Sequence, residues 1–156
     1  MRMCRGHYTL ADDMPDSYAL LQSRCSKAVY SYGTALYFWG LSDRIPHLFD
    51  ITVPQGTNVS RLQQQDPSLR FHYVRAEIYA LGRTELISPL GSPVWVYDKE
   101  RCVCDLVRLG DRADRQLYVQ AIKGYFADEP DVRKLFRYGK QLGVAEKLRI
   151  YTEVLT

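Results

Sequence analysis

The segment VWVYDKERCVCDLVR (residues 94–108) brings carboxylates, cations and two cysteines close together, in a pattern that could support chemistry. Metal-dependent nucleases use an acid on one strand and an acid-x-lysine pair on the next. Asp50, on one expected strand, and Asp98-Lys99-Glu100, after another, partly fit that pattern. The lysine, however, lies between the two acids, and a cluster of charges is also common where a helix begins. We therefore interpret the segment as a strand–helix joint, with a carboxylate metal site and an interaction surface as the alternatives.

In this interpretation a strand ends at Tyr97 and Asp98 is the N-cap of a helix, a contribution of about 1 kcal/mol. Arg101, Asp105 and Arg108 follow at spacings of four and three residues. They are therefore expected to form ion pairs on the exposed face of that helix, each worth roughly 0.2–0.5 kcal/mol. The spacing places Cys102 on the apolar face and Cys104 nearer the polar face.

The remaining cysteines and the histidines do not predict a metal site. No two of Cys4, Cys25, Cys102 and Cys104 have C-x-x-C spacing, and the three histidines are scattered. No nucleophile–base pair or phosphate-binding glycine loop is recognisable, which favours a protein that is not an enzyme and needs no cofactor. The N-terminus has no apolar signal region, and no apolar run approaches a membrane span. These features predict a cytoplasmic protein with reduced thiols and no membrane contact.

Hydrophobic periodicity places these residues on a series of short elements. Period-two patterns and turn residues predict strands at 27–31, 47–54, 69–75, 83–88 and 93–97, the last two forming a hairpin. In the strand at 69–75, Leu69, Phe71 and Tyr73 are expected on the buried face. Helices are expected at 17–23, 32–39 (capped by Ser31) and 59–64, and four more follow Asp98. The sequence therefore predicts an α+β domain: a small, mostly antiparallel sheet packed with helices, and an all-helical C-terminal third.

One stretch, SYGTALYFWGLSDRIPHLFDITVPQGTN, resembles the AbiEi family, the antitoxins of bacterial type IV toxin–antitoxin systems that act in abortive infection, a phage defence. In that family a motif of the type S-H-x-(S/T)-A-L-x-x-x-G-L-(T/S)-D-x-x-P leads into a strand that ends in V-P. The matching residues here are Ser31, Thr34, Ala35, Leu36, Gly40, Leu41, Asp43, Pro46, Val53 and Pro54.

A second family motif, Y-D-x-E-R-T-(I/L)-x-D-x-x-R, resembles the segment that begins at Tyr97. The matching residues are Tyr97, Asp98, Glu100, Arg101, Asp105 and Arg108. The helical end is also similar, so the resemblance extends from about residue 5 to residue 155. Tyr32 and Trp39 stand where family members often have histidine, and Cys102 replaces the usual threonine.

The resemblance implies a non-catalytic antitoxin that counters a nucleotidyltransferase toxin of the same operon, without requiring direct contact. Full-length relatives also repress their own operon through an N-terminal winged helix-turn-helix. Here residues 1–15 resemble only the last wing strand of that motif and a linker, and residues 16–156 resemble the antitoxin domain. Sequence-specific DNA binding is therefore expected to be weakened.

Two surfaces are candidates for function. The polar residues of the two motifs are expected to converge on an antitoxin surface made of Ser31, Asp43, Arg44, Asp98, Arg101, Asp105 and Arg108. A basic stripe on a late helix could contact phosphates through Arg133, Lys134, Arg137 and Lys140. The stripe supports the alternative function, a nucleic-acid-binding transcriptional regulator or a relic nuclease-like domain. The alternative without a binding role is helix capping for the motif residues and a solvated helix face for the basic stripe.

Overall fold

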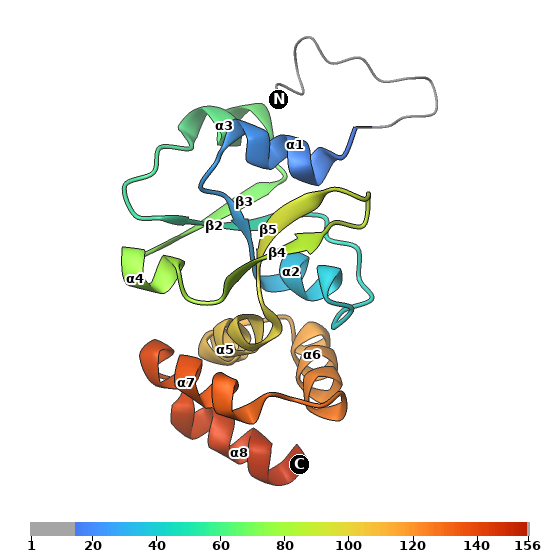
Figure 1. Ribbon diagram of the computed structural model, residues 1–156, viewed down its shortest axis with the longest axis vertical. Coiled ribbons are helices and arrows are strands. Elements are labelled where there is room, and N and C mark those ends of the chain that lie inside the picture. Colours follow the sequence, from blue (N-terminus) through green and yellow to red (C-terminus); the bar gives the residue numbers. More distant parts are fainter. Residues whose placement is uncertain (1–14, 156) are drawn as a thin grey trace.

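The computed structural model describes residues 15–155, which form a sheet layer and, below it in Figure 1, a group of helices. The expected wing-strand remnant lies almost wholly outside the described residues. The α+β prediction is confirmed, and so is the all-helical C-terminal third. None of the helices within residues 15–155 is long and apolar enough to cross a membrane.

The sheet has five strands in the order β3-β2-β1-β5-β4. Their bounds are β1 Val29–Tyr30, β2 Phe49–Pro54, β3 Leu69–Val74, β4 Arg83–Ile87 and β5 Pro93–Tyr97. The pairs β1–β2 and β4–β5 are antiparallel, whereas β1–β5 and β2–β3 are parallel. The sheet is therefore mixed, where a mostly antiparallel sheet was expected, because the helices between strands return the chain for parallel pairing.

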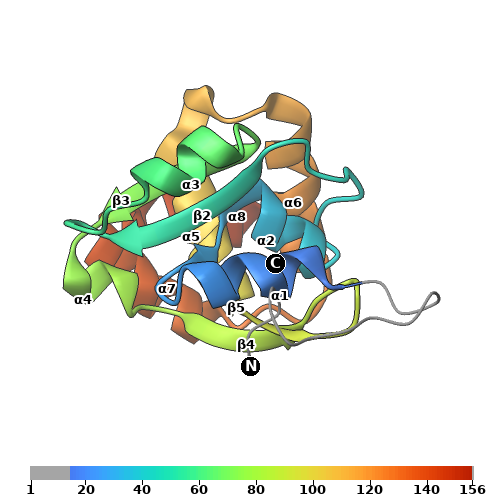
Figure 2. The same cartoon turned by 90° about the horizontal axis from the view of Figure 1, so that it is seen from above.

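Four short helices accompany the strands: α1 Ser17–Arg24, α2 Tyr32–Phe38, α3 Ser60–Gln65 and α4 Ala76–Tyr79. Helices α1 and α3 lie on one side of the sheet, and α2 lies on the side of the C-terminal helices (Figures 1 and 2). The Asp16 carboxylate caps α1 by accepting from the N–H groups of Tyr18 and Ala19. Ser31 holds the N-cap position of α2, but its hydroxyl accepts from Thr52 instead of capping the helix.

The C-terminal part consists of α5 Lys99–Leu109, the 3-10 turn η1 Gly110–Arg112, α6 Arg115–Ala127, α7 Val132–Leu142 and α8 Ala145–Leu155. Helix α5 is central, since it packs against α2 on one side and against α6, α7 and α8 on the others. Helices α7 and α8 approach closely at Gly139, where a Cβ atom would come within 2.5 Å of a Leu148 methyl group. A side chain at position 139 would therefore force the buried Leu148 side chain to shift.

Because α5 is enclosed, its residues from Glu100 to Val107 are all buried. The expectation that Cys104 lies toward a polar surface is wrong, since its thiol is buried and donates to the Leu135 carbonyl at 3.7 Å. Among the described residues Cys25, Cys102 and Cys104 are free. The expected burial of Tyr73 is also wrong: this ring is 47% exposed near the end of β3, which forms the sheet edge.

Candidate polar binding site

The two segments that carry the family resemblance meet in the structure. The Trp39 indole, at the end of α2, donates to the Tyr97 carbonyl at 2.8 Å, where β5 ends. At the other end of α2, Arg108 of α5 donates to the Tyr32 hydroxyl at 3.2 Å. Residues far apart in the sequence therefore build one unit, in which α2 lies along α5.

Asp98 caps α5, as the sequence predicts, because its carboxylate accepts from the Arg101 N–H at 2.9 Å. The same carboxylate also accepts from the Tyr138 hydroxyl at 2.8 Å and pairs with Lys134 at 3.1 Å. Asp98 therefore joins the start of α5 to α7. The strand–helix joint is confirmed at this residue.

Of the carboxylates considered for a metal site, Asp98 and Glu100 share Lys134, whereas Asp50 has other partners. Asp50 accepts from Arg70 at 2.6 Å and contacts His72 at 2.9 Å, whereas Glu100 accepts from Tyr125 at 2.8 Å and pairs with Lys134 at 3.3 Å. Within residues 15–155 no group of three or more His, Cys, Asp or Glu side chains could hold a metal ion. The nuclease-like arrangement of acids is therefore not found there.

The expected antitoxin surface is largely internal. Ser31, Asp98, Arg101 and Asp105 are buried, so the expectation that they face solvent is wrong. The physical reason is the central position of α5, whose polar side packs against neighbouring elements. The residues of that set that remain accessible to solvent are Asp43, Arg44 and, in part, Arg108.

Arg101 and Asp105 form the predicted ion pair, but inside the protein rather than on its surface. The Arg101 Nε lies 3.1 Å from each Asp105 carboxylate oxygen, and both side chains are 1% exposed. The Arg101 guanidinium also donates to the carbonyls of Ile78 and Leu81, at 2.6 and 2.7 Å, and lies 4.1 Å from the centre of the Tyr97 ring. Burial raises the pKa of Asp105 despite the adjacent guanidinium groups.

The polar contacts continue from this pair toward the sheet. Arg108 bridges Asp105 at 3.4 Å and the Tyr32 hydroxyl, and the Tyr32 ring lies over His72 with centroids 4.3 Å apart. Tyr32 has a φ of +48°, a conformation that L-residues other than Asn and Asp rarely adopt. Such backbone strain is often found at ligand-binding and active sites.

Beyond His72, the Asp50 carboxylate completes the chain of contacts. Burial raises the pKa of Asp50, but hydrogen bonds from His72 and Arg70 outweigh this effect and hold the pKa below its usual value. Asp50 on β2 is therefore ionised, and Arg70, opposite it on β3, balances its charge.

A pocket of about 470 Å³ opens beside this network, and we call it the polar pocket. Arg44, Arg70 and Arg112 lie around it, and Leu106 and Leu117 contribute apolar surface. Arg44 pairs with Asp114 at 3.0 Å and Arg70 with Asp50, whereas the Arg112 side chain has no polar partner within residues 15–155. Guanidinium groups in this setting suit a carboxylate or phosphate group.

The basic stripe is located on α7. Arg133, Arg137 and Lys140 are exposed and share one side of the helix, as the sequence predicts. Lys134 is not free to join them, because its side chain is only 31% exposed and its ammonium group pairs with Asp98 and Glu100. The open stripe is therefore three residues long.

Sequence reasoning missed Arg70, His72 and Arg112 as parts of a site. Arg70 and His72 alternate with Leu69 and Phe71 in the predicted strand, which was a signal that they share the opposite face. Their pairing with Asp50 depends on the register of β2 against β3, in which Asp50 lies opposite Arg70. That register cannot be read from either strand alone.

No protein-family model matches the sequence. No curated protein matches it at a significant level. The AbiEi resemblance therefore rests on the two motifs and the helical end, and it stays a prediction.

Proposed function

We propose that the chain is a non-catalytic antitoxin of a type IV toxin–antitoxin system, which counters a nucleotidyltransferase toxin encoded beside it. The supporting observation is that the two motif segments pack together through the contacts Trp39–Tyr97 and Tyr32–Arg108, in which Tyr32 and Trp39 stand where family members often have histidine. Two short resemblances carry more weight when their residues pack into one unit than when they lie apart.

Beside this unit, the rim of the polar pocket is open to a partner. The side chains of Arg44 and Arg70 are 46% and 54% exposed, and Arg112 is exposed and unpaired within residues 15–155. Arginine groups recognise carboxylates and phosphates through two parallel hydrogen bonds. We assign the antitoxin surface to this rim, in place of the buried polar residues of α5.

The test is co-expression with the nucleotidyltransferase toxin from the same operon in growing cells. The parent chain is expected to restore growth, and Arg44→Ala combined with Arg112→Ala is expected to lose that rescue at equal abundance. The matched control is Arg24→Ala combined with Arg61→Ala, because both residues are exposed and lie on α1 and α3, across the sheet. A parent chain that does not restore growth contradicts the antitoxin proposal, and a rim variant that rescues fully contradicts the surface assignment.

The second candidate function is nucleic-acid binding by a transcriptional regulator. The observation that favours it is the exposed stripe of Arg133, Arg137 and Lys140 on α7. Binding through such a stripe neutralises phosphates, so it is expected to weaken steeply with salt and to show little sequence preference. Fluorescence anisotropy with a labelled operator duplex and a scrambled duplex, each at several salt concentrations, tests both properties.

A further inference from the structure

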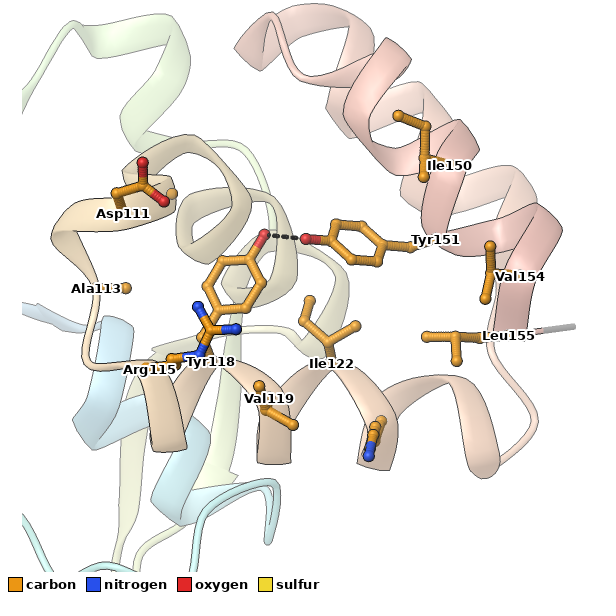
Figure 3. A pocket seen from close by; sticks show the side chains of 12 residues that line it. Asp111, Ala113, Arg115, Tyr118, Val119, Ile122, Ile150, Tyr151, Val154 and Leu155 are labelled. Carbon is orange, nitrogen blue, oxygen red and sulfur yellow. Dashed lines mark hydrogen bonds between the residues drawn. The ribbon is translucent and has the colours of Figure 1, made fainter.

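A second concave region lies between α6 and α8 (Figure 3), next to the polar pocket, with which it shares Ala113. This α6–α8 groove has a volume of about 540 Å³, and its lining includes Val119, Ile122, Ile150 and Val154. The hydroxyl groups of Tyr118 and Tyr151 lie 2.7 Å apart and connect the two helices. The groove is therefore a fixed feature of the packing between α6 and α8.

Large apolar side chains at the groove are exposed. Ile150 is 62% exposed, Val154 is 74% exposed and Val119 is 40% exposed. Ile150 and Val154 are four residues apart on α8, so they form one continuous strip. Contiguous exposed apolar surface of this kind is typical of an interaction site.

The charges beside the apolar side chains differ between the two helices. On α6, Arg115, Val119 and Lys123 are spaced by four residues, so a cation lies on each side of the valine. On α8, Glu146 and Glu153 form a row with Ile150 on one side of it, whereas Lys147 lies on its other side. The row on α6 is thus cation–apolar–cation, and the row on α8 is acid–apolar–acid.

These two rows do not satisfy each other within one molecule. The side chains of Arg115, Lys123 and Glu153 have no polar partner within residues 15–155, and Glu146 pairs only with Arg149 of its own helix, at 3.1 Å. On α8 the two glutamates lie on the side of the Ile150–Val154 strip that is turned away from Tyr151, which contacts α6. They are therefore placed to meet a different helix from their own α6.

We propose that the α6–α8 groove is the interface of a homodimer, in which α8 of each copy lies between α6 and α8 of the other. Ile150 and Val154 of one copy then contact Val119 of its partner. Glu146 approaches the partner's Arg115, and Glu153 approaches the partner's Lys123. A two-fold axis makes this contact twice, as an interface built from one self-complementary surface requires. Charge complementarity therefore selects a second copy of this chain as the occupant of the groove.

The first test is the mass of the purified chain in solution, measured by sedimentation equilibrium. The parent is expected to be a dimer, and Ile150→Asp is expected to be a monomer because a carboxylate in the groove would lose its water on dimerisation. Ile150 is mostly exposed, so the variant should keep the parent's circular dichroism spectrum. A parent that remains monomeric up to its solubility limit overturns the proposal.

The second test uses charge reversal to separate this contact from other apolar associations. Lys123→Glu and Glu153→Lys should each weaken dimerisation at least tenfold, since each places like charges opposite one another. An equal mixture of the two variants should restore dimers, because the mixed dimer brings the new glutamate opposite the new lysine and keeps one native pair. The control is Arg61→Glu, a reversal at an exposed cation on α3, which should leave the dimer unchanged.

Two further outcomes would overturn the proposal. A mixture that stays monomeric while each variant is folded refutes the assigned pairing. A monomeric parent that binds vesicles of anionic phospholipid, and loses that binding in Ile150→Asp, would assign the groove to a membrane surface instead.

Discussion

Replacing Arg101 by methionine tests the buried ion pair on α5, within the second motif segment. The substitution keeps most of the side-chain volume but removes the guanidinium that contacts both oxygens of Asp105. It also removes the donors to the carbonyls of Ile78 and Leu81, which lie in and after α4. Asp105 would then retain only the longer contact to Arg108, at 3.4 Å.

The expected loss is about 3–5 kcal/mol at neutral pH, because removing one partner of a buried ion pair leaves an uncompensated charge. That amount is a large part of the 5–15 kcal/mol that stabilises a typical domain. The Arg101→Met, Asp105→Leu double variant should lose less than Arg101→Met alone, since no buried charge remains. The comparison separates the burial of a lone carboxylate from the loss of packing.

Urea unfolding followed by tryptophan fluorescence measures these free energies, because Trp39 contacts the core of the domain. The loss in Arg101→Met should be smaller near pH 4 than at pH 7. Burial already raises the folded-state pKa of Asp105, and removing the guanidinium raises it further. The folded variant therefore binds a proton more tightly than the unfolded chain, so its stability falls as the pH rises from the pKa of Asp105 in the unfolded chain to its raised pKa in the folded protein.

Arg149→Met is the matched control, because Arg149 and Glu146 form an exposed pair on α8 at a comparable distance of 3.1 Å. Exposed pairs contribute about 0–1 kcal/mol, so this variant should unfold almost like the parent. If Arg101→Met costs less than about 1 kcal/mol, or if the double variant is less stable than the single one, the reasoning from burial is refuted.

Three further predictions concern other parts of the network and the surface. Asp98→Ala should lower the free energy of unfolding by about 1–3 kcal/mol, more than the loss of a simple cap, because it also leaves a buried hydroxyl without its acceptor. The urea midpoint checks this, and a loss of hydrogen-exchange protection confined to the first turn of α5 would contradict it. His72→Ala should raise the pKa of Asp50, which His72 helps to hold low. The stability that this carboxylate contributes is present above its pKa in the unfolded chain and is lost as the pH falls through its pKa in the folded protein, so the variant should unfold at a higher pH on acidification. An unchanged pH midpoint of acid unfolding would argue against the pairing. Arg133→Ala combined with Arg137→Ala should weaken any binding of duplex DNA equally for operator and scrambled sequences. The salt dependence of that binding should decrease by the amount expected for about two lost phosphate contacts. A selective loss of operator binding, measured by anisotropy, would show that the stripe reads bases.

The sequence by itself predicted most of the elements and their order, but not the short helix α4. The change from period two to a helical period after Asp98 predicts the end of β5 and the start of α5, because both the cap and the stripe are local features. The same reasoning predicts that α7 ends near Gly143, which adopts the left-handed conformation; it places Pro130 in the first turn, whereas Asp131 caps a helix that begins at Val132. Each of these signals lies within a few residues of the structure that it specifies.

Only the tertiary structure decided which polar residues face solvent. Periodicity assigns a polar face to α5 but does not reveal that α2, α6, α7 and α8 surround this helix. Arg101 and Asp105 satisfy each other and the nearby carbonyls, so their charges can be buried where a sequence pattern predicts exposure. The polar pocket likewise depends on the alignment of β2 with β3, because only that register brings Asp50 to Arg70 and His72. Contacts between residues distant in the sequence, rather than any local pattern, assemble the candidate site.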